Sequence, residues 1–148
     1  MNRLALATMG LTALLTLTTV LACGQAAKEK SRETHSHFTK IPAAVADIWK
    51  EIHKQQARLV STVAKKDLGE AHDHAFAIRD LVKALPGKIA PENKTAAEAA
   101  AKEITKLAAE IDRSGAARAQ KATEAGVKQM GEAVLALEAK LKPTGTSK

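Results

Sequence analysis

The recurrence of apolar residues at steps of three and four, from Ile41 to about Lys140, constrains the fold more than any other feature of this sequence. Such steps place apolar side chains on one face of an α-helix, whereas a half-buried strand alternates apolar and polar residues. No segment of the sequence shows that alternation. We therefore expect an all-α protein.

Proline, glycine and serine residues divide this region into four amphipathic helices. They are expected at about residues 42–64, 67–85 and 91–114, with a fourth helix that ends near Lys140; Asp67 is expected to cap the second, and Ser114-Gly115 to end the third. The expected inward positions are Ile41, Val45, Ile48, Ile52 and Leu59; Leu68, Ala71, Ala75, Ile78, Val82 and Leu85; Ala97, Ala100, Ile104, Leu107 and Ile111; and Ala119, Thr123, Gly126, Met130, Val134, Leu137 and Leu141. Because the connections are short, neighbouring helices should be antiparallel, as in an up-down-up-down four-helix bundle.

The amino-terminal segment has the layout of a secretory signal, with Arg3 followed by the apolar stretch Leu4–Ala22. Its last residues, Val20-Leu21-Ala22-Cys23, resemble the lipobox of bacterial lipoproteins. That resemblance implies cleavage before Cys23, lipidation of its thiol and acylation of the new amino terminus. Because Gly24 rather than aspartate follows, it also implies an outer-membrane lipoprotein that faces the periplasm. An uncleaved membrane anchor and an ordinary secreted protein are the alternatives.

These observations divide the chain into a signal peptide (1–22), a flexible lipid-anchored tether (23–40), the helical bundle (41–142) and a disordered tail (143–148). Cys23 is the only cysteine, so no disulfide or cysteine metal ligand is expected. The net charge is +7, but acidic residues are interleaved with the basic ones. We therefore expect attachment to a membrane through the lipid, and no binding of nucleic acid.

Groups that could perform catalysis do not converge in the predicted bundle, so we expect no enzymatic activity. The expected architecture resembles the soluble four-helix cytochromes of the periplasm, which hold haem through methionine and histidine or through a Cys-x-x-Cys-His attachment. This chain has no such attachment motif, and its last helix contains Met130 but no histidine. No haem is therefore expected.

Histidines are the remaining candidates for chemistry, and two of them lie in the segment GEAHDHAF. On a helix, His72 and His74 point about 160° apart and cannot hold one ion together. His74 has Glu70 one turn earlier, and His53 should lie within about one turn of it across the first connection. The sequence therefore predicts a possible site for copper, zinc or nickel at His53, Glu70 and His74, with an open coordination position. The alternative is that these histidines only bond to neighbouring side chains.

Two weaker candidates complete the set of possible ligands. His72 shares its side of the helix with Phe76 and Arg79, and a nearby guanidinium disfavours a bound cation. His35 and His37 form a His-x-His pair in the predicted tether, which would bind a metal weakly on its own.

The strings IWKEIHKQQ and AFAIRDLVKALPGK, within residues 38–88, are similar to small exported helical proteins of proteobacteria that occur beside metal-efflux systems. This resemblance implies a role in metal homeostasis or resistance. The expected function is thus a non-catalytic periplasmic lipoprotein that binds a transition metal through histidines of its first two helices. The alternative is an envelope interaction module that binds a protein partner and no metal.

Overall fold

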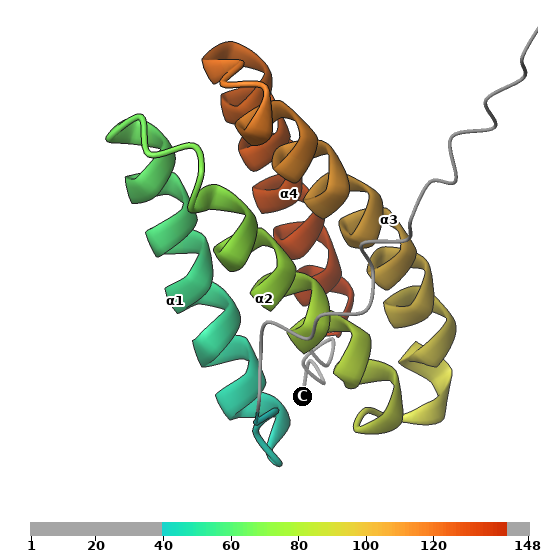
Figure 1. Cartoon of the computed structure of the whole chain (residues 1–148). Helices are drawn as coiled ribbons and strands as arrows, with labels where there is room; N and C mark the ends of the chain where they lie inside the picture. The colour runs from blue at the N-terminus through green and yellow to red at the C-terminus, as the bar shows by residue number, and fades with distance from the viewer. Residues whose placement is uncertain (1–39, 142–148) are drawn as a thin grey trace, which may run out of the picture. The chain divides into compact units, whose positions relative to one another are not determined.

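Helices form all the regular structure in the computed structural model, which describes residues 40–141 (Figure 1). They are α1 (Val45–Ala64), α2 (Ala71–Ala84), α3 (Pro91–Ala116) and α4 (Gln120–Leu141), with a 3₁₀ turn, η1 (Leu85–Gly87), after α2. Residues 40–141 contain no strand, so the all-α prediction is confirmed for this part of the chain. The predicted signal peptide, Cys23, the His35 and His37 pair and the tail at 143–148 lie outside the described residues.

The helices pack in chain order, with α1 against α2, α2 against α3 and α3 against α4. Helix α1 also contacts α4, but less extensively than the other pairs. The core between them is aliphatic, and every predicted inward position of the second helix is buried. Ile41, Val45, Ala100 and Leu141 are only partly buried, and they pack at the edge of this core. No helix among residues 40–141 is both long and apolar enough to cross a bilayer.

The prediction that Asp67 caps the second helix is wrong. Helix α2 begins at Ala71, and the backbone amide of Asp67 instead donates to the carbonyl of Thr62 at 3.1 Å. Asp67 therefore belongs to the end of α1, where that bond satisfies a carbonyl with no partner inside the helix. Leu68 is nevertheless buried as predicted, because the connection folds back onto the core.

Helices α1 and α3 end in the same way. Lys66 and Arg118 have positive φ angles of 64° and 53°, and their amides donate to carbonyls three residues earlier. In both turns the next amide, of Asp67 or Ala119, donates to a carbonyl five residues earlier. These are the two bonds of a Schellman motif, whose left-handed position normally holds glycine. Here lysine and arginine occupy it.

Gly115 does not end the third helix, contrary to the prediction, because α3 continues to Ala116. It is buried against the first connection, and a Cβ placed on it would lie 2.6 Å from the backbone oxygen of Leu68. The absence of a side chain at Gly115 therefore allows the turn after α1 to pack directly on α3.

Candidate functional site

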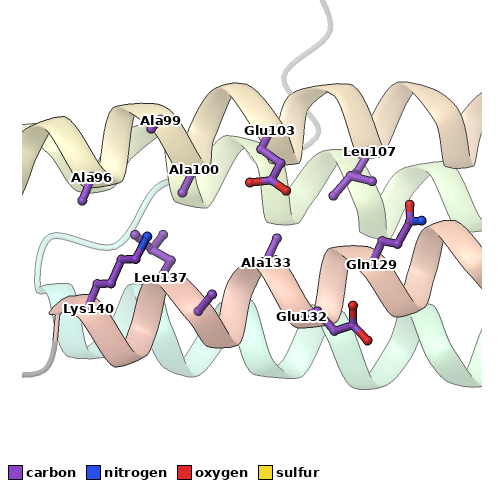
Figure 2. Close-up of a pocket in the computed structure, with 11 residues that line it drawn as sticks. Ala96, Ala99, Ala100, Glu103, Leu107, Gln129, Glu132, Ala133, Leu137 and Lys140 are labelled. Carbon is purple, nitrogen blue, oxygen red and sulfur yellow. The ribbon is translucent and has the colours of Figure 1, made fainter.

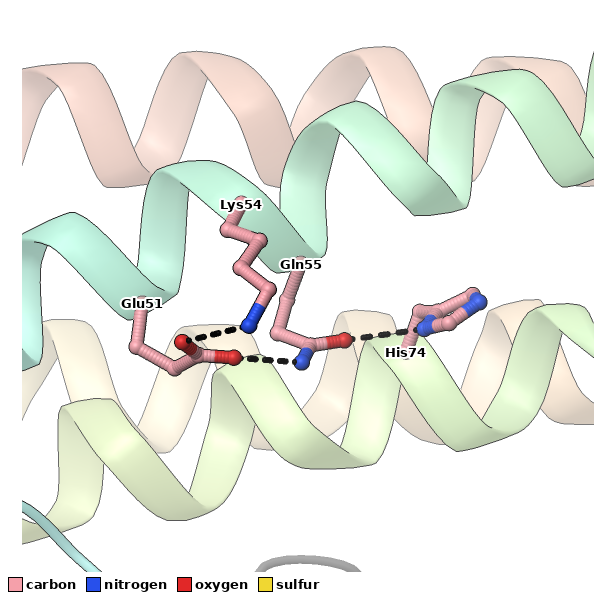
Figure 3. A network of polar contacts seen from close by, with 4 residues as sticks. All are labelled: Glu51, Lys54, Gln55 and His74. Carbon is pink, nitrogen blue, oxygen red and sulfur yellow. Dashed lines mark hydrogen bonds and ion pairs between the residues drawn. The ribbon is translucent and has the colours of Figure 1, made fainter.

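A chain of four polar side chains links α1 to α2 at His74 (Figure 3). Lys54 Nζ donates to Glu51 Oε2 at 3.2 Å, and Gln55 Nε2 donates to Glu51 Oε1 at 2.8 Å. Gln55 Oε1 lies 2.9 Å from Nδ1 of His74. Although glutamine is polar, Gln55 is buried, and these contacts satisfy both ends of its amide.

The network fixes the protonation pattern of the His74 ring. Because the Gln55 amide nitrogen donates to a carboxylate, the Gln55 oxygen must face His74 and accept a hydrogen bond. Nδ1 of His74 therefore carries the proton, and Nε2 of the neutral ring keeps its lone pair. Many metal-binding histidines are oriented in the same way by a hydrogen bond at the other ring nitrogen.

Burial, followed by the positive charge of Arg58, lowers the pKa of His74 below its ordinary value of 6.5, and the carboxylates of Asp73 and Glu70 only partly oppose this. At Glu51, burial acts to raise the pKa, but hydrogen bonds from Gln55 and Lys54 and nearby positive charges lower it overall. His74 is therefore neutral at neutral pH, with a cation nearby that disfavours a second positive charge.

The low pKa of His74 predicts how stability depends on pH. Just below pH 6.5 the unfolded chain binds a proton at His74 that the folded chain does not, so the free energy of unfolding should fall as the pH drops through this window. We expect urea unfolding between about pH 5 and pH 7 to show this slope, and the His74→Gln variant to lose part of it. An unchanged slope in the variant would contradict the assignment.

His53 lies on the side of α1 that faces α4, whereas His74 contacts α1 from α2. Its Nε2 lies 3.4 Å from Oε2 of Glu138 on α4, and its side chain is 44% exposed. The ring centres of Trp49 and His53 lie 6.2 Å apart, with an angle of 31° between the ring planes. His53 thus forms part of the contact between α1 and α4.

Both ring nitrogens of His72 lie against oxygen atoms. Nδ1 is 2.6 Å from the carbonyl oxygen of Gly69, and Nε2 is 3.0 Å from Oδ1 of Asp73. The ring centres of His72 and Phe76 lie 6.3 Å apart with their planes at 72°, and the Arg79 guanidinium lies 4.5 Å from the centre of the Phe76 ring. These contacts give His72 a structural role at the start of α2, in line with its ranking as a weaker ligand candidate.

The predicted metal ligands are not brought together as one set. His53 faces Glu138, whereas His74 bonds to Gln55, and Glu70 is an exposed residue next to the start of α2. Within residues 40–141, no three histidine, cysteine, aspartate or glutamate side chains form a group that could hold a metal ion. Of the predicted ligands, His53 thus lies on the side of α1 that faces α4, whereas His74 contacts α1 from α2.

The interface between α1 and α4 is held by separate polar contacts. Near its ends, Gln120 Nε2 donates to the carbonyl of Val63 at 2.9 Å, and His53 meets Glu138. Between these contacts, Gln56 Nε2 lies 3.6 Å from the position that a Cβ on Gly131 would occupy. We call this interface the α1–α4 seam.

A mainly apolar groove of about 360 Å³ opens along the α1–α4 seam. Its lining residues are Val60, Val63, Ala64, Glu124, Val127, Lys128 and Gly131. Val60 is 56% exposed and Leu135 is 59% exposed, and they are the only large hydrophobic residues exposed within residues 40–141. Leu135 follows Gly131 by four residues and so lies on the same face of α4.

A second groove, of about 430 Å³, lies between α3 and α4 (Figure 2). Small side chains create it: Ala96, Ala99 and Ala100 line it from α3, and Ala133 lines it from α4. Of these four alanines, only Ala100 was among the predicted inward positions. Glu103 and Lys140 flank the groove with opposite charges.

Two residues of the site were missed in the sequence. Gln55 completes the step from Ile52 to Leu59 on the buried stripe of α1, and this gap in the apolar pattern was the available signal. Glu138 gave no signal, because its contact with His53 depends on how α4 lies against α1. Comparison with known protein families, curated proteins and solved structures gives no match for this chain, so its function is inferred from these contacts.

Proposed function

We propose that this chain is a non-catalytic, lipid-anchored module of the bacterial envelope that binds a helix of a partner protein at the α1–α4 seam. The lipid anchor at Cys23 and the periplasmic location rest on the lipobox resemblance. The observation that favours protein binding is the mainly apolar groove at the seam, which has the exposed Val60 in its lining. Contiguous apolar surface rimmed by polar groups is typical of interaction sites, whereas single exposed hydrophobic residues are not informative.

An amphipathic helix fits the shape and charge of the seam best. Val60 and Val127 line the groove together, and Leu135 lies eight residues beyond Val127, or about 12 Å along α4. A partner helix with apolar residues seven or eight positions apart would contact both Val60 in the groove and Leu135 beyond it. Beside them, the side-chain charges alternate in sign at four-residue spacing, at Glu124, Lys128 and Glu132. This pattern favours a partner helix whose charges alternate in the opposite order.

We also propose that the four helices run up, down, up and down, which makes the seam the closure between the first and last helices. The pairing of α1 with α4 supports this arrangement. Val63 meets Gln120, Gln56 lies against Gly131 and His53 meets Glu138. Residue numbers thus fall along α1 as they rise along α4, as they do for antiparallel neighbours.

Photo-crosslinking in living cells tests the seam. A benzophenone amino acid placed at position 60 or at position 135 of the full chain should give the same crosslinked partner, identified by mass spectrometry. The matched control places it at Lys102, an exposed position on α3, and should not give that partner. Adducts with a second copy of this chain, or equal adducts at all three positions, would contradict the proposal.

A transition metal is the second candidate ligand, and the separation of His53 and Glu138 favours it. Zinc bonds to histidine nitrogen and carboxylate oxygen at about 2.0–2.2 Å, so two such ligands in tetrahedral geometry lie about 3.4 Å apart. The distance between His53 Nε2 and Glu138 Oε2 is 3.4 Å. This pair would supply two ligands, with the remaining positions open to water or to a ligand from a partner.

Thermal unfolding of the full chain with zinc, copper or nickel tests the metal proposal. At a hundredfold excess over Kd, binding to the folded state alone adds about 2.7 kcal/mol to stability. We expect the shift to disappear in His53→Gln/Glu138→Gln and to remain in the control His35→Gln/His37→Gln. No shift with any metal, or a shift lost only in the control, would contradict this site.

A further inference from the structure

The two Schellman turns lie at the same end of the helices (Figure 1). Together they line a cavity of about 570 Å³ that is open to solvent. Lys66, Asp67, Leu68 and Gly69 line it from the connection between α1 and α2. Gly115, Ala116, Arg118 and Gln120 line it from the end of α3 and the start of α4. The cavity is separate from the α1–α4 seam groove, with which it shares no lining residue.

Two basic residues line this cavity, one from each turn. Lys66 and Arg118 are both exposed, and neither side chain has an ion-pair or hydrogen-bond partner within residues 40–141. Asp67 is the only acidic residue of the lining, so the cavity has an excess of positive charge. Arginine supplies a planar fork of donors that matches phosphate oxygens, and lysine adds a compact charge.

The backbone holds both cations in a conformation that favours glycine. Left-handed φ angles are costly for residues with a Cβ, yet lysine and arginine occupy both turns. The close approach of Gly115 to the Leu68 backbone fixes one turn against the other. The backbone positions from which the two side chains extend are therefore set by two turns that pack against each other.

We infer that this cavity, between Lys66 and Arg118, binds the phosphate group of an anionic ligand. The cavity shares only Gln120 with the contacts of the α1–α4 seam and has no histidine in its lining, so the inference does not rest on the function proposed above. Two sources offer the same chemistry: phosphate or a phosphate ester in solution, and the headgroup of an anionic phospholipid. Asp67 opposes such a ligand and limits its affinity.

The test titrates the full chain in neutral detergent micelles with inorganic phosphate, at an ionic strength held constant with chloride, while amide NMR shifts are recorded. We expect the shifts to concentrate in the two turns. Lys66→Gly/Arg118→Gly should weaken phosphate binding about tenfold or more, because each charge-assisted hydrogen bond is lost. Asp67→Asn should strengthen it about twofold to fivefold.

A matched control separates this site from general charge. Lys50→Gln/Lys102→Gln also removes two exposed lysine charges, but both residues lie outside the cavity, so phosphate affinity should stay within about twofold. The glycine variant should fold at least as well as the parent, because glycine suits both left-handed positions. A weaker fold in that variant would contradict the backbone argument, and the Asp67→Asn result would still test binding.

A second experiment, in lipid nanodiscs, distinguishes a soluble phosphate ligand from a phospholipid headgroup. The full chain is placed in nanodiscs of phosphatidylcholine alone or with added phosphatidylglycerol, and the shifts of the same turns are compared. Shifts with inorganic phosphate identify a soluble ligand, and shifts only with phosphatidylglycerol identify a lipid headgroup. No shift in either arm, or equal losses in the lysine control, would overturn the inference.

Discussion

Asp80→Ala is expected to destabilise the folded chain by about 3–5 kcal/mol, because it removes a carboxylate from a buried guanidinium. Arg79 is only 4% exposed, and its Nε and one terminal nitrogen lie 2.8 Å and 2.7 Å from Oδ1 of Asp80. The guanidinium would lose this carboxylate while it stays buried on α2, beside Phe76. Such a loss is a large part of the total stability of an ordinary domain. Urea unfolding at neutral pH measures it.

Two further variants show whether burial causes this effect. Glu132→Ala breaks the exposed pair with Lys128, whose charged atoms lie 3.9 Å apart, and should cost no more than about 1 kcal/mol. Arg79→Leu/Asp80→Ala removes both buried charges and should recover much of the stability lost in Asp80→Ala. If Asp80→Ala and Glu132→Ala had equal effects, the buried pair would not have the role assigned to it.

Gly115→Ala is expected to destabilise the chain by about 1–3 kcal/mol, although alanine is normally the better residue in a helix. The new Cβ would lie 2.6 Å from the carbonyl oxygen of Leu68, and a backbone atom cannot move aside as a flexible side chain can. The turn after α1 would have to shift away from α3. Thermal or urea unfolding gives the difference.

Gly131→Ala is the matched control, because Gly131 also lies within a helix. Its nearest neighbour is the side-chain nitrogen of Gln56, at the ordinary contact distance of 3.6 Å from the new Cβ. We expect this variant to be as stable as the parent or up to about 1 kcal/mol more stable. Destabilisation of both variants by the same amount would contradict the close approach at Gly115.

The helical fold was accessible from the sequence because the apolar stripes are local patterns. Ile48, Ile52 and Leu59 recur at helical steps, and their burial follows from that spacing alone. The start of α2 was not accessible, because Asp67 has the chemistry of an N-cap but its amide is used at the end of α1. Residue type alone does not decide between these two roles.

The candidate site was predicted less well because it depends on contacts between distant helices. His53 and His74 were expected to converge across the first connection. They lie on different sides of α1, where one faces Glu138 and the other bonds to Gln55. A shift of one or two residues in the packing of a helix turns a side chain to another face, and periodicity does not set that register.

The partner peptides crosslinked from positions 60 and 135 test the central proposal most directly. Because Val60 lines the groove and Leu135 lies about 12 Å beyond Val127, both crosslinks should fall within one amphipathic helix of one protein. We predict that the two crosslinked residues of that partner lie seven or eight positions apart. Crosslinks to unrelated proteins, or to another copy of this chain, would contradict a helix-binding seam.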